Sequence, residues 1–157
     1  MAMTSFTALE LASALPRLLA LAVEWAENQS KSIRETGIAL DASGTQLARS
    51  VGVQHPERIR LKYVGAIPLP DNDELRQAAV QAGLLGTGTI GLTLGYGVYL
   101  VERRISEPLI RHECRHVHQY EEAGSLQAFL ARYIPEVLEF GYFDAPLEKD
   151  AREHEEE

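Results

Sequence analysis

The chain has 157 residues, of which 45% are hydrophobic and 24% are charged, a composition that suits one globular domain spanning residues 1–157. Its formal net charge of −8 argues against nonspecific binding to nucleic acid phosphates, so we expect no nucleic acid partner. The single cysteine, Cys114, excludes an internal disulfide, and cysteine usage therefore gives no sign of an oxidising compartment.

Three segments of the sequence indicate where in the cell the protein is expected: its two ends and one uncharged stretch. The N-terminal residues lack a basic region, and the apolar stretch behind them is interrupted by Pro16 and Arg17, so we expect no secretory signal. Residues 77–101 are uncharged over a length that could span a membrane, but their glycines and strand-like alternation argue against a span. The acidic residues 153–157 are expected to form a solvated, frayed tail. We therefore expect a cytoplasmic protein.

In chain order, the first predicted element is an amphipathic packing helix over residues 7–29, within segment 1–30, because apolar residues recur there at helical spacing. Pro16 is expected to kink this helix or to split off its first turn. Residues 30–57 are polar and rich in turn formers, which predicts a loop or a short helix. Apolar and basic residues then alternate over 58–63, the pattern of a strand.

The second half of the chain predicts further helices around a small sheet. Residues 73–85 predict a helix, and the sequence TIGLTLGYGVYLV at 89–101 indicates one bent strand or two paired strands. Three helices follow, with Ser106, Ser125 and Asp144 as their N-caps. These elements predict an α+β fold with an N-terminal helix, a small, mostly antiparallel sheet and three C-terminal helices.

Residues 111–119 read RHECRHVHQ and concentrate groups that bind metals. His112 and His116 are four residues apart, so on a helix they lie on one face, one turn from each other. Two imidazole nitrogens at this spacing can reach one zinc ion at about 2.0–2.1 Å. Glu113 lies about 100° further round the helix, too far to be a third ligand but placed to take a proton from water on the metal.

The remaining positions of this motif fall outside the ligand face. Gln119 is seven residues beyond His112 and returns to that face, where it can hold a ligand in place, and Arg115 flanks the face. Cys114 lies opposite and is expected in the core, while His118 points away. The competing interpretation is a surface helix with solvated histidines, and we favour the metal site over it.

A catalytic zinc site needs a third protein ligand and leaves a fourth position for water. A carboxylate from a later helix can supply it, and Glu148 is favoured because it stands one turn into a helix that can return after segment 125–140. The small Ala151 allows that helix to lie close to the histidines. Asp150 and Asp144 are the alternatives.

HECRHVHQ, followed by a helix and then by APLEKDA, resembles the gluzincin branch of the zinc metallopeptidases. That branch carries HExxH on one helix and a glutamate, often in an ExxA context, on a later helix. The short chain, the glycine-rich strand GLTLGYGVYL and the segment GYFDAPLEKDA are similar to the small bacterial minigluzincins. The resemblance covers about residues 58–152 and implies a zincin-like fold, with two further helices after the HExxH helix.

The resemblance also implies the parts of an active site. One zinc ion per chain would be held by His112, His116 and Glu148, with Glu113 as the general base that hydrolyses a peptide bond. The strand before the site would form the edge of the cleft and hold an extended peptide. The strand residues expected there are Leu92, Leu94, Gly95 and Gly97.

Two further positions complete the predicted site. A tyrosine can donate a hydrogen bond to the polarised carbonyl, and Tyr142 is preferred because it lies near the helix of the last ligand. Asp144, together with Gln119 and Arg115, is expected beside the ligands.

Three hypotheses follow for the function. The first is a small zinc metallopeptidase acting on a peptide or protein substrate. The second is a catalytically weak or inactive zinc-binding domain that interacts with or regulates a protein partner, with the metal contributing to folding. The third is a metal-free adaptor that uses the 7–29 helix as its partner surface. We rank them in this order.

Overall fold

The structure is a computed structural model, and it describes residues 5–156, which form an α+β fold of six α-helices and one four-stranded mixed sheet. Residues 1–4 of the predicted packing segment and Glu157 of the predicted tail lie outside the described residues. In chain order the elements are α1 (Ala8–Thr36), β1 (Ile38–Ala39), α2 (Ala42–Ser50), a 3₁₀ turn (Pro56–Arg58), β2 (Arg60–Val64), α3 (Asp73–Gln81), β3 (Gly91–Leu94), β4 (Gly97–Val101), a second 3₁₀ turn (Glu102–Arg104), α4 (Glu107–Ala123), α5 (Leu126–Phe140) and α6 (Pro146–Glu153).

The sheet has the strand order β1-β2-β4-β3, so β3 lies at one edge. β1 pairs with β2 and β3 pairs with β4 in antiparallel fashion, whereas β2 and β4 are parallel. The glycine-rich stretch therefore forms two paired strands rather than one bent strand. Gly95 makes the tight turn between them with a φ of 67°, a conformation that glycine adopts without steric cost.

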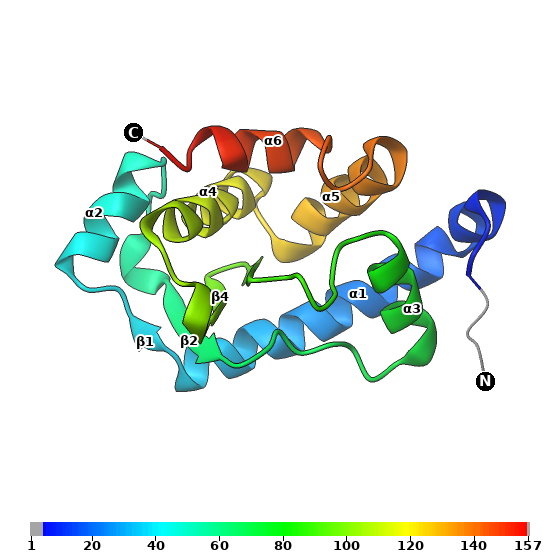
Figure 1. The fold of residues 1–157 in the computed structure, drawn as a ribbon, viewed down its shortest axis with the longest axis horizontal. Helices are drawn as coiled ribbons and strands as arrows, with labels where there is room; N and C mark the ends of the chain where they lie inside the picture. The colour runs from blue at the N-terminus through cyan, green and yellow to red at the C-terminus, as the bar shows by residue number, and fades with distance from the viewer. Residues whose placement is uncertain (1–4, 157) are drawn as a thin grey trace.

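Helices cover both faces of the sheet, with α1 on one side and α4 on the other (Figure 1). The side chains of β4 alternate between these two layers. Val98 packs in the same apolar cluster as Val117 of α4, and Tyr99 packs in the cluster that contains Ile33 of α1. Burial on both faces explains why β4 is apolar throughout instead of alternating with polar residues.

The first helix is longer than the sequence predicts. Thr7 and Glu10 form a capping box at its start, and the helix continues through Pro16 to Thr36. The polar stretch after residue 29 stays helical because Ser30 and Ile33 are buried against the sheet, and the Ser30 hydroxyl donates to the Leu94 carbonyl at 2.7 Å. Tertiary packing therefore overrides the local polarity there.

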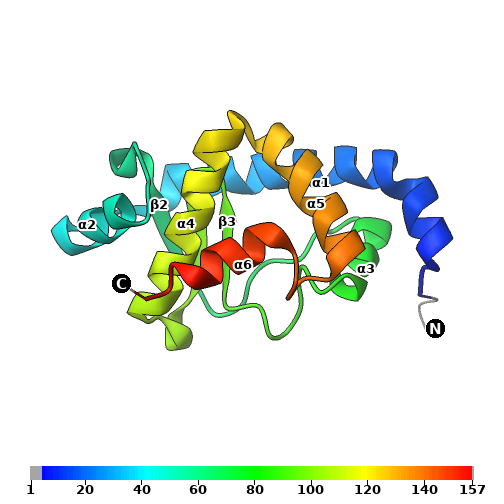
Figure 2. The ribbon, with the colours of Figure 1, turned by 90° about the horizontal axis from the view of Figure 1, so that it is seen from above.

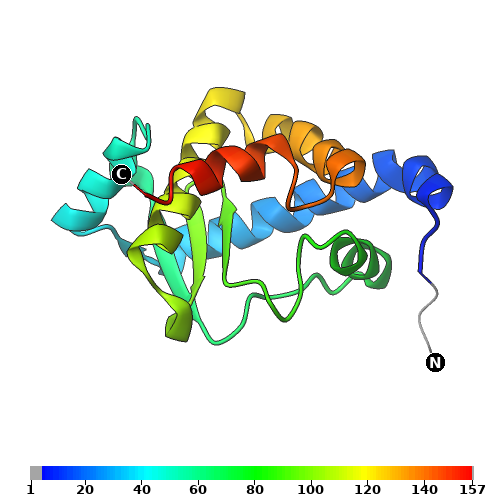
Figure 3. The ribbon, with the colours of Figure 1, turned by 45° about the horizontal axis from the view of Figure 1, so that its top comes forward.

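The C-terminal helices begin and end near the predicted residues. Ser106 and Ser125 cap α4 and α5 through their side chains, and Gly124 ends α4 in the left-handed conformation. The prediction that Asp144 caps α6 is wrong, because the N-cap is Ala145 and Pro146 opens the helix. Figures 2 and 3 show α6 lying across α4, on the side away from α1.

The segment after α6 differs from the solvated tail that its acidic sequence predicts. His154 and Glu155 are half-buried, and the buried Arg111 of α4 donates to the His154 carbonyl at 2.9 Å and to the Glu156 carbonyl at 3.3 Å. The charge pattern misses this because the arginine contacts backbone oxygens, not acidic side chains. Separately, none of the helices within residues 5–156 combines the length and apolar character needed to cross a membrane.

Candidate metal centre

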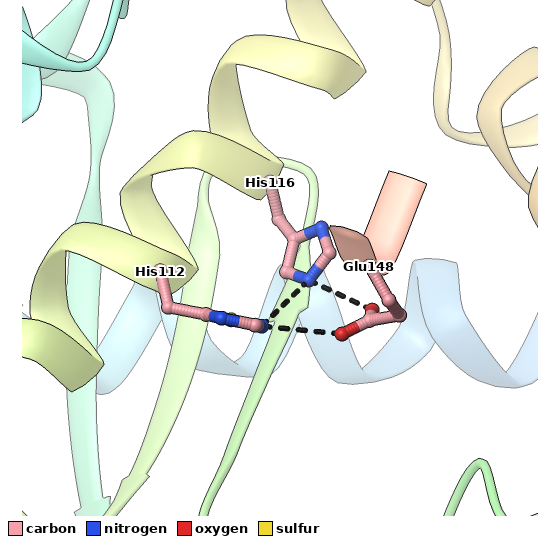
Figure 4. Close-up of side chains that lie close together, drawn as sticks. All are labelled: His112, His116 and Glu148. Atoms are coloured by element: carbon pink, nitrogen blue, oxygen red, sulfur yellow. Dashed lines mark hydrogen bonds and ion pairs between the residues drawn. The ribbon is translucent and has the colours of Figure 1, made fainter. Parts of the chain in front are cut away.

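The two histidines of α4 point toward the same place. Their four-residue spacing stacks them one turn apart, and His112 Nε2 lies 3.2 Å from His116 Nε2 (Figure 4). The His116 side chain is 9% exposed and that of His112 is 12% exposed. Two imidazole nitrogens that converge at this depth are poorly solvated, so they require a polar or ionic partner.

Glu148 of α6 supplies that partner from the other side. Its Oε1 lies 3.2 Å from His112 Nε2, and its Oε2 lies 2.9 Å from His116 Nε2. The residue is 1% exposed, so its carboxylate has exchanged water for these contacts. His112, His116 and Glu148 thus form a buried group that can hold a metal ion.

The spacing of these atoms fits a small tetrahedral cation. Tetrahedral zinc with bonds of about 2.0–2.1 Å separates neighbouring ligand atoms by about 3.3–3.4 Å. His112 Nε2 lies 3.2 Å from His116 Nε2, and the two rings face different oxygens of Glu148, Oε1 at 3.2 Å and Oε2 at 2.9 Å. With one ligand atom taken from each residue, these atoms all lie within 4.8 Å of one another, so small side-chain adjustments bring them around one cation. Two imidazoles and one carboxylate also match the donor set of open catalytic zinc sites.

The cluster is strongly polarised. Burial alone would raise the pKa of the Glu148 carboxyl, but the neighbouring His116, His112 and Tyr133 hold it well below its usual range. Burial alone would lower the pKa of His116, but the Glu148 carboxylate raises it to about 9. An ion pair therefore occupies the site in the metal-free chain, with Glu148 charged and His116 protonated at neutral pH.

Gln119 fixes the ring of His116. Its Nε2 donates to the Leu147 carbonyl at 2.9 Å and to Asp150 Oδ2 at 2.8 Å, so its Oε1 must face His116 Nδ1, which lies 2.7 Å away. The proton on Nδ1 leaves the Nε2 lone pair of the neutral ring directed at the metal position. Gln119 therefore lies beside His116, on the helix face where the sequence analysis places it.

Arg115 does not contact the histidines or Glu148 but pairs with Asp150 beside them. Its guanidinium grips Asp150 with two hydrogen bonds, at 2.8 and 3.2 Å, and donates to the Val51 carbonyl. Because its charge is neutralised by Asp150, it does not oppose a cation in the site. Asp150, an alternative ligand from sequence, instead links Arg115 to Gln119.

Tyr133 of α5 was not predicted as a partner of the ligands. Its hydroxyl donates to Glu148 Oε2 at 2.7 Å and helps hold the carboxylate in place. Burial, followed by the negative charge of Glu148, raises the pKa of Tyr133 well above its usual value, so it remains a donor. No spacing rule along the sequence predicts this contact, because Tyr133 and Glu148 lie on different helices and only the tertiary fold brings them together.

Glu113 lies beside the cluster without joining it. Its carboxylate Oε2 accepts a hydrogen bond of 2.7 Å from the Thr93 hydroxyl, which also donates to the Glu113 carbonyl. On the other side it packs against Gly91, where an added Cβ would lie 2.6 Å from Glu113 Oε1. Gly91 and Thr93 of β3 therefore position this carboxylate, and neither was singled out from sequence.

A cleft opens over these groups. It is lined by loop residues 86–91, by His112 and Glu113 of α4, and by Tyr142 and Glu148. Burial, followed by the negative charge of Glu148 and Glu113, raises the pKa of Tyr142, so its hydroxyl stays protonated and can donate within the cleft.

The other predicted site residues lie elsewhere. Leu92 and Leu94 point into an apolar cavity bounded by α1, α3 and α5. Gly95 lies in the hairpin turn, and Gly97 lies on the inner strand β4 against Ile33. Within residues 5–156, Asp144 is exposed and makes no hydrogen bond or ion pair with the site. The strand positions were expected at the cleft from the family resemblance, but the hairpin and the edge place Gly91 nearest the site.

The protein was also compared with known proteins. No protein-family model matches the chain, and comparisons with curated proteins and with solved structures gave no match.

Proposed function

We propose that this protein is a zinc metallopeptidase with a zincin-like arrangement. The observation that carries the proposal is the convergence of His112, His116 and Glu148 at ligand spacing, with Glu113 of the same helix in the same cleft. A buried cluster of this composition at the floor of an open cleft is suited to metal-assisted hydrolysis.

Each side chain has a distinct role in this proposal. The zinc ion would be held by His112, His116 and Glu148. When bound, it supplies a Lewis acid and lowers the pKa of a bound water molecule toward neutral pH. Glu113 takes the proton from the attacking water and passes it to the leaving amine, while Thr93 keeps its carboxylate turned toward the cleft. Tyr142 donates a hydrogen bond to the carbonyl oxygen of the substrate as negative charge develops on it.

The edge strand supports a peptide substrate. The Ile90 carbonyl accepts from the Val101 amide, and because antiparallel strands alternate their hydrogen bonding, the backbone groups of Gly91 point away from β4. Gly91 lines the cleft beside Glu113, so an extended peptide can pair with this edge close to the base. The lack of a side chain at Gly91 leaves room for that approach.

The test of the proposal is Glu113→Gln, which keeps the shape of the base and removes its charge. We expect wild type to bind one zinc per chain and to cleave members of a peptide library, with cleavage abolished by chelation. Glu113→Gln should bind zinc as tightly as wild type and cleave nothing. Cleavage by the variant at the wild-type rate would exclude Glu113 as the base.

A second candidate is a zinc-binding interaction domain without turnover. It is favoured by the exposed apolar side chains Leu69, Val80 and Phe143, which gather around the cleft as at a protein interface. In that case the metal would join α4 to α6 and contribute folding free energy. Wild-type protein that binds zinc stoichiometrically and cleaves no peptide would favour this candidate.

A further inference from the structure

His112 also has a partner that would hold its ring, as Gln119 holds His116. Glu155, in the segment after α6, places its Oε1 3.5 Å from His112 Nδ1. Its side chain also lines the cleft. Across residues 5–156, no other carboxylate or amide oxygen is paired with that nitrogen.

The segment that carries Glu155 is fixed in place rather than free to move away. Arg111 is 5% exposed, and it donates from Nε to the His154 carbonyl and from NH2 to the Glu156 carbonyl, on either side of Glu155. Its remaining nitrogen, NH1, donates to the Ser50 hydroxyl at 3.1 Å. All three nitrogens of this buried guanidinium therefore donate hydrogen bonds, and two of these bonds hold the backbone on either side of Glu155.

The segment itself forms a compact turn. The Glu155 amide donates to the Arg152 carbonyl at 3.1 Å, and His154 Nδ1 lies 2.7 Å from the Asp150 carbonyl. The turn and Arg111 together set the position of the Glu155 backbone, from which the side chain reaches His112 Nδ1.

We propose that Glu155 is a positioning residue of the metal centre, which holds the Nδ1 proton of His112 and thereby aims His112 Nε2 at His116 and Glu148. Arg111 acts through Glu155 by anchoring the residues before and after it. The inference rests on the metal-binding function proposed above and adds a residue that the HExxH motif does not contain.

The chemistry follows from the two nitrogens of an imidazole. A carboxylate beside Nδ1 stabilises the tautomer that carries its proton there, and that tautomer leaves the Nε2 lone pair free for a metal. Without Glu155, the His112 ring can rotate or adopt the other tautomer. Returning the ring to the orientation and tautomer that bind zinc then costs free energy, which weakens zinc binding.

The experiment measures the zinc dissociation constant by chelator competition. Loss of a partner that holds a metal-binding histidine weakens metal binding by about 10–100-fold, and the 3.5 Å separation places Glu155→Ala at the low end, about tenfold. Glu155→Gln retains an oxygen that can accept from Nδ1, so it should recover most of the affinity. Glu153→Ala, an exposed glutamate on the last turn of α6, should bind zinc as wild type does.

A structural role of Glu155 is separated from a positioning role by the metal-free protein. The melting temperatures of wild type, Glu155→Ala and Glu155→Gln should agree after chelation. Zinc binding by Glu155→Ala within twofold of wild type would overturn the inference, as would an affinity loss matched by an equal loss of metal-free stability. Failure of wild type to bind zinc would instead reject the proposed function.

The role of Arg111 is tested by a double-mutant cycle. Arg111→Lys keeps the positive charge but loses the fork that grips both carbonyls. We expect it to weaken zinc binding in the wild-type background and to have no further effect in Glu155→Ala. Equal effects in both backgrounds would show that Arg111 does not act through Glu155.

Discussion

At the scale of single residues, the position of the Glu113 carboxylate depends on the absence of a side chain at Gly91. Gly91 has no Cβ where one would lie 2.6 Å from Glu113 Oε1 and 3.0 Å from its carboxyl carbon. A Cβ at these distances would require either the Glu113 side chain or the strand to shift. Gly91 therefore leaves room for the observed rotamer of Glu113, whose carboxylate also accepts a hydrogen bond from the Thr93 hydroxyl.

Gly91→Ala should consequently disable hydrolysis without removing the metal. We expect the variant to bind zinc with wild-type affinity and to lose at least tenfold in kcat/KM, because the carboxylate is displaced from its position near the reacting water. Gly88→Ala is the matched control, since Gly88 lines the same cleft and an added Cβ there would meet nothing within 4 Å. Equal activity of the two variants would contradict this account of Gly91.

The ion pair between His116 and Glu148 makes the metal-free chain sensitive to pH. Since the pKa of His116 in the fold is raised to about 9 from 6.5, its stabilisation is present below pH 6.5 and is lost as the pH rises toward 9. The loss is on the order of 3 kcal/mol. Urea midpoints of chelated protein should fall across this range.

The control for this pH dependence is His116→Gln, which removes the titrating group. Its urea midpoint should vary less between pH 6.5 and 9 than that of wild type, whatever its absolute stability. Parallel pH profiles for the two proteins would assign the effect to other groups.

At the scale of elements, α6 is short and depends on the contacts of the site. It contains 8 residues, too few to be stable alone, and it meets α4 through Glu148 on the histidines and Asp150 on Arg115 and Gln119. A metal bound by both helices would join them directly. Removing it leaves only the ion pairs and packing.

Chelation should therefore loosen α6 more than the rest of the fold. We expect amide hydrogen exchange over residues 146–153 to accelerate on zinc removal, while the inner strand β4 keeps its protection because both its faces are covered. The same experiment on Glu148→Gln, with and without chelator, should show no difference. Uniform exchange changes across the chain would argue against a local role of the metal in α6.

The elements also show how far sequence reasoning extends. The helix of the HExxH motif, its Ser106 cap and its Gly124 end were predictable because caps and periodicity are local. The burial of Cys114 and the position of Gln119 beside His116 were also predictable from helical angles. The parallel pairing of β2 with β4 could not be predicted, because α3 and the loops around it separate the two strands.

The residues that contact the predicted site from other elements were missed for the same reason. Tyr133, Thr93 and Glu155 each contact the site from a different element, and their contacts depend on tertiary packing that no local pattern encodes. Likewise, the acidic composition of 153–157 predicted solvation because the buried Arg111 is distant in sequence from the backbone it binds.

At the scale of the whole molecule, His112, His116 and Glu148 connect two helices that lie in different layers of the fold. α4 packs on the sheet, α1 covers the opposite face, and α6 lies across α4, so the cluster connects the outermost helix α6 to the helix that packs on the sheet (Figure 1). A ligand that binds only this assembled state stabilises all of it, because unfolding separates Glu148 from the histidines.

Zinc should therefore raise the melting temperature of the entire chain. At a free zinc concentration about 100-fold above its dissociation constant, the stabilisation is about 2.7 kcal/mol. For a domain of this size that corresponds to about 5–10 °C. Glu113→Gln should keep the full shift, because Glu113 is not a ligand, whereas Glu148→Gln and His112→Gln should lose it. A shift of wild-type size in both ligand variants would show that zinc binds to other groups and that His112, His116 and Glu148 are not its site, even if peptide cleavage persisted.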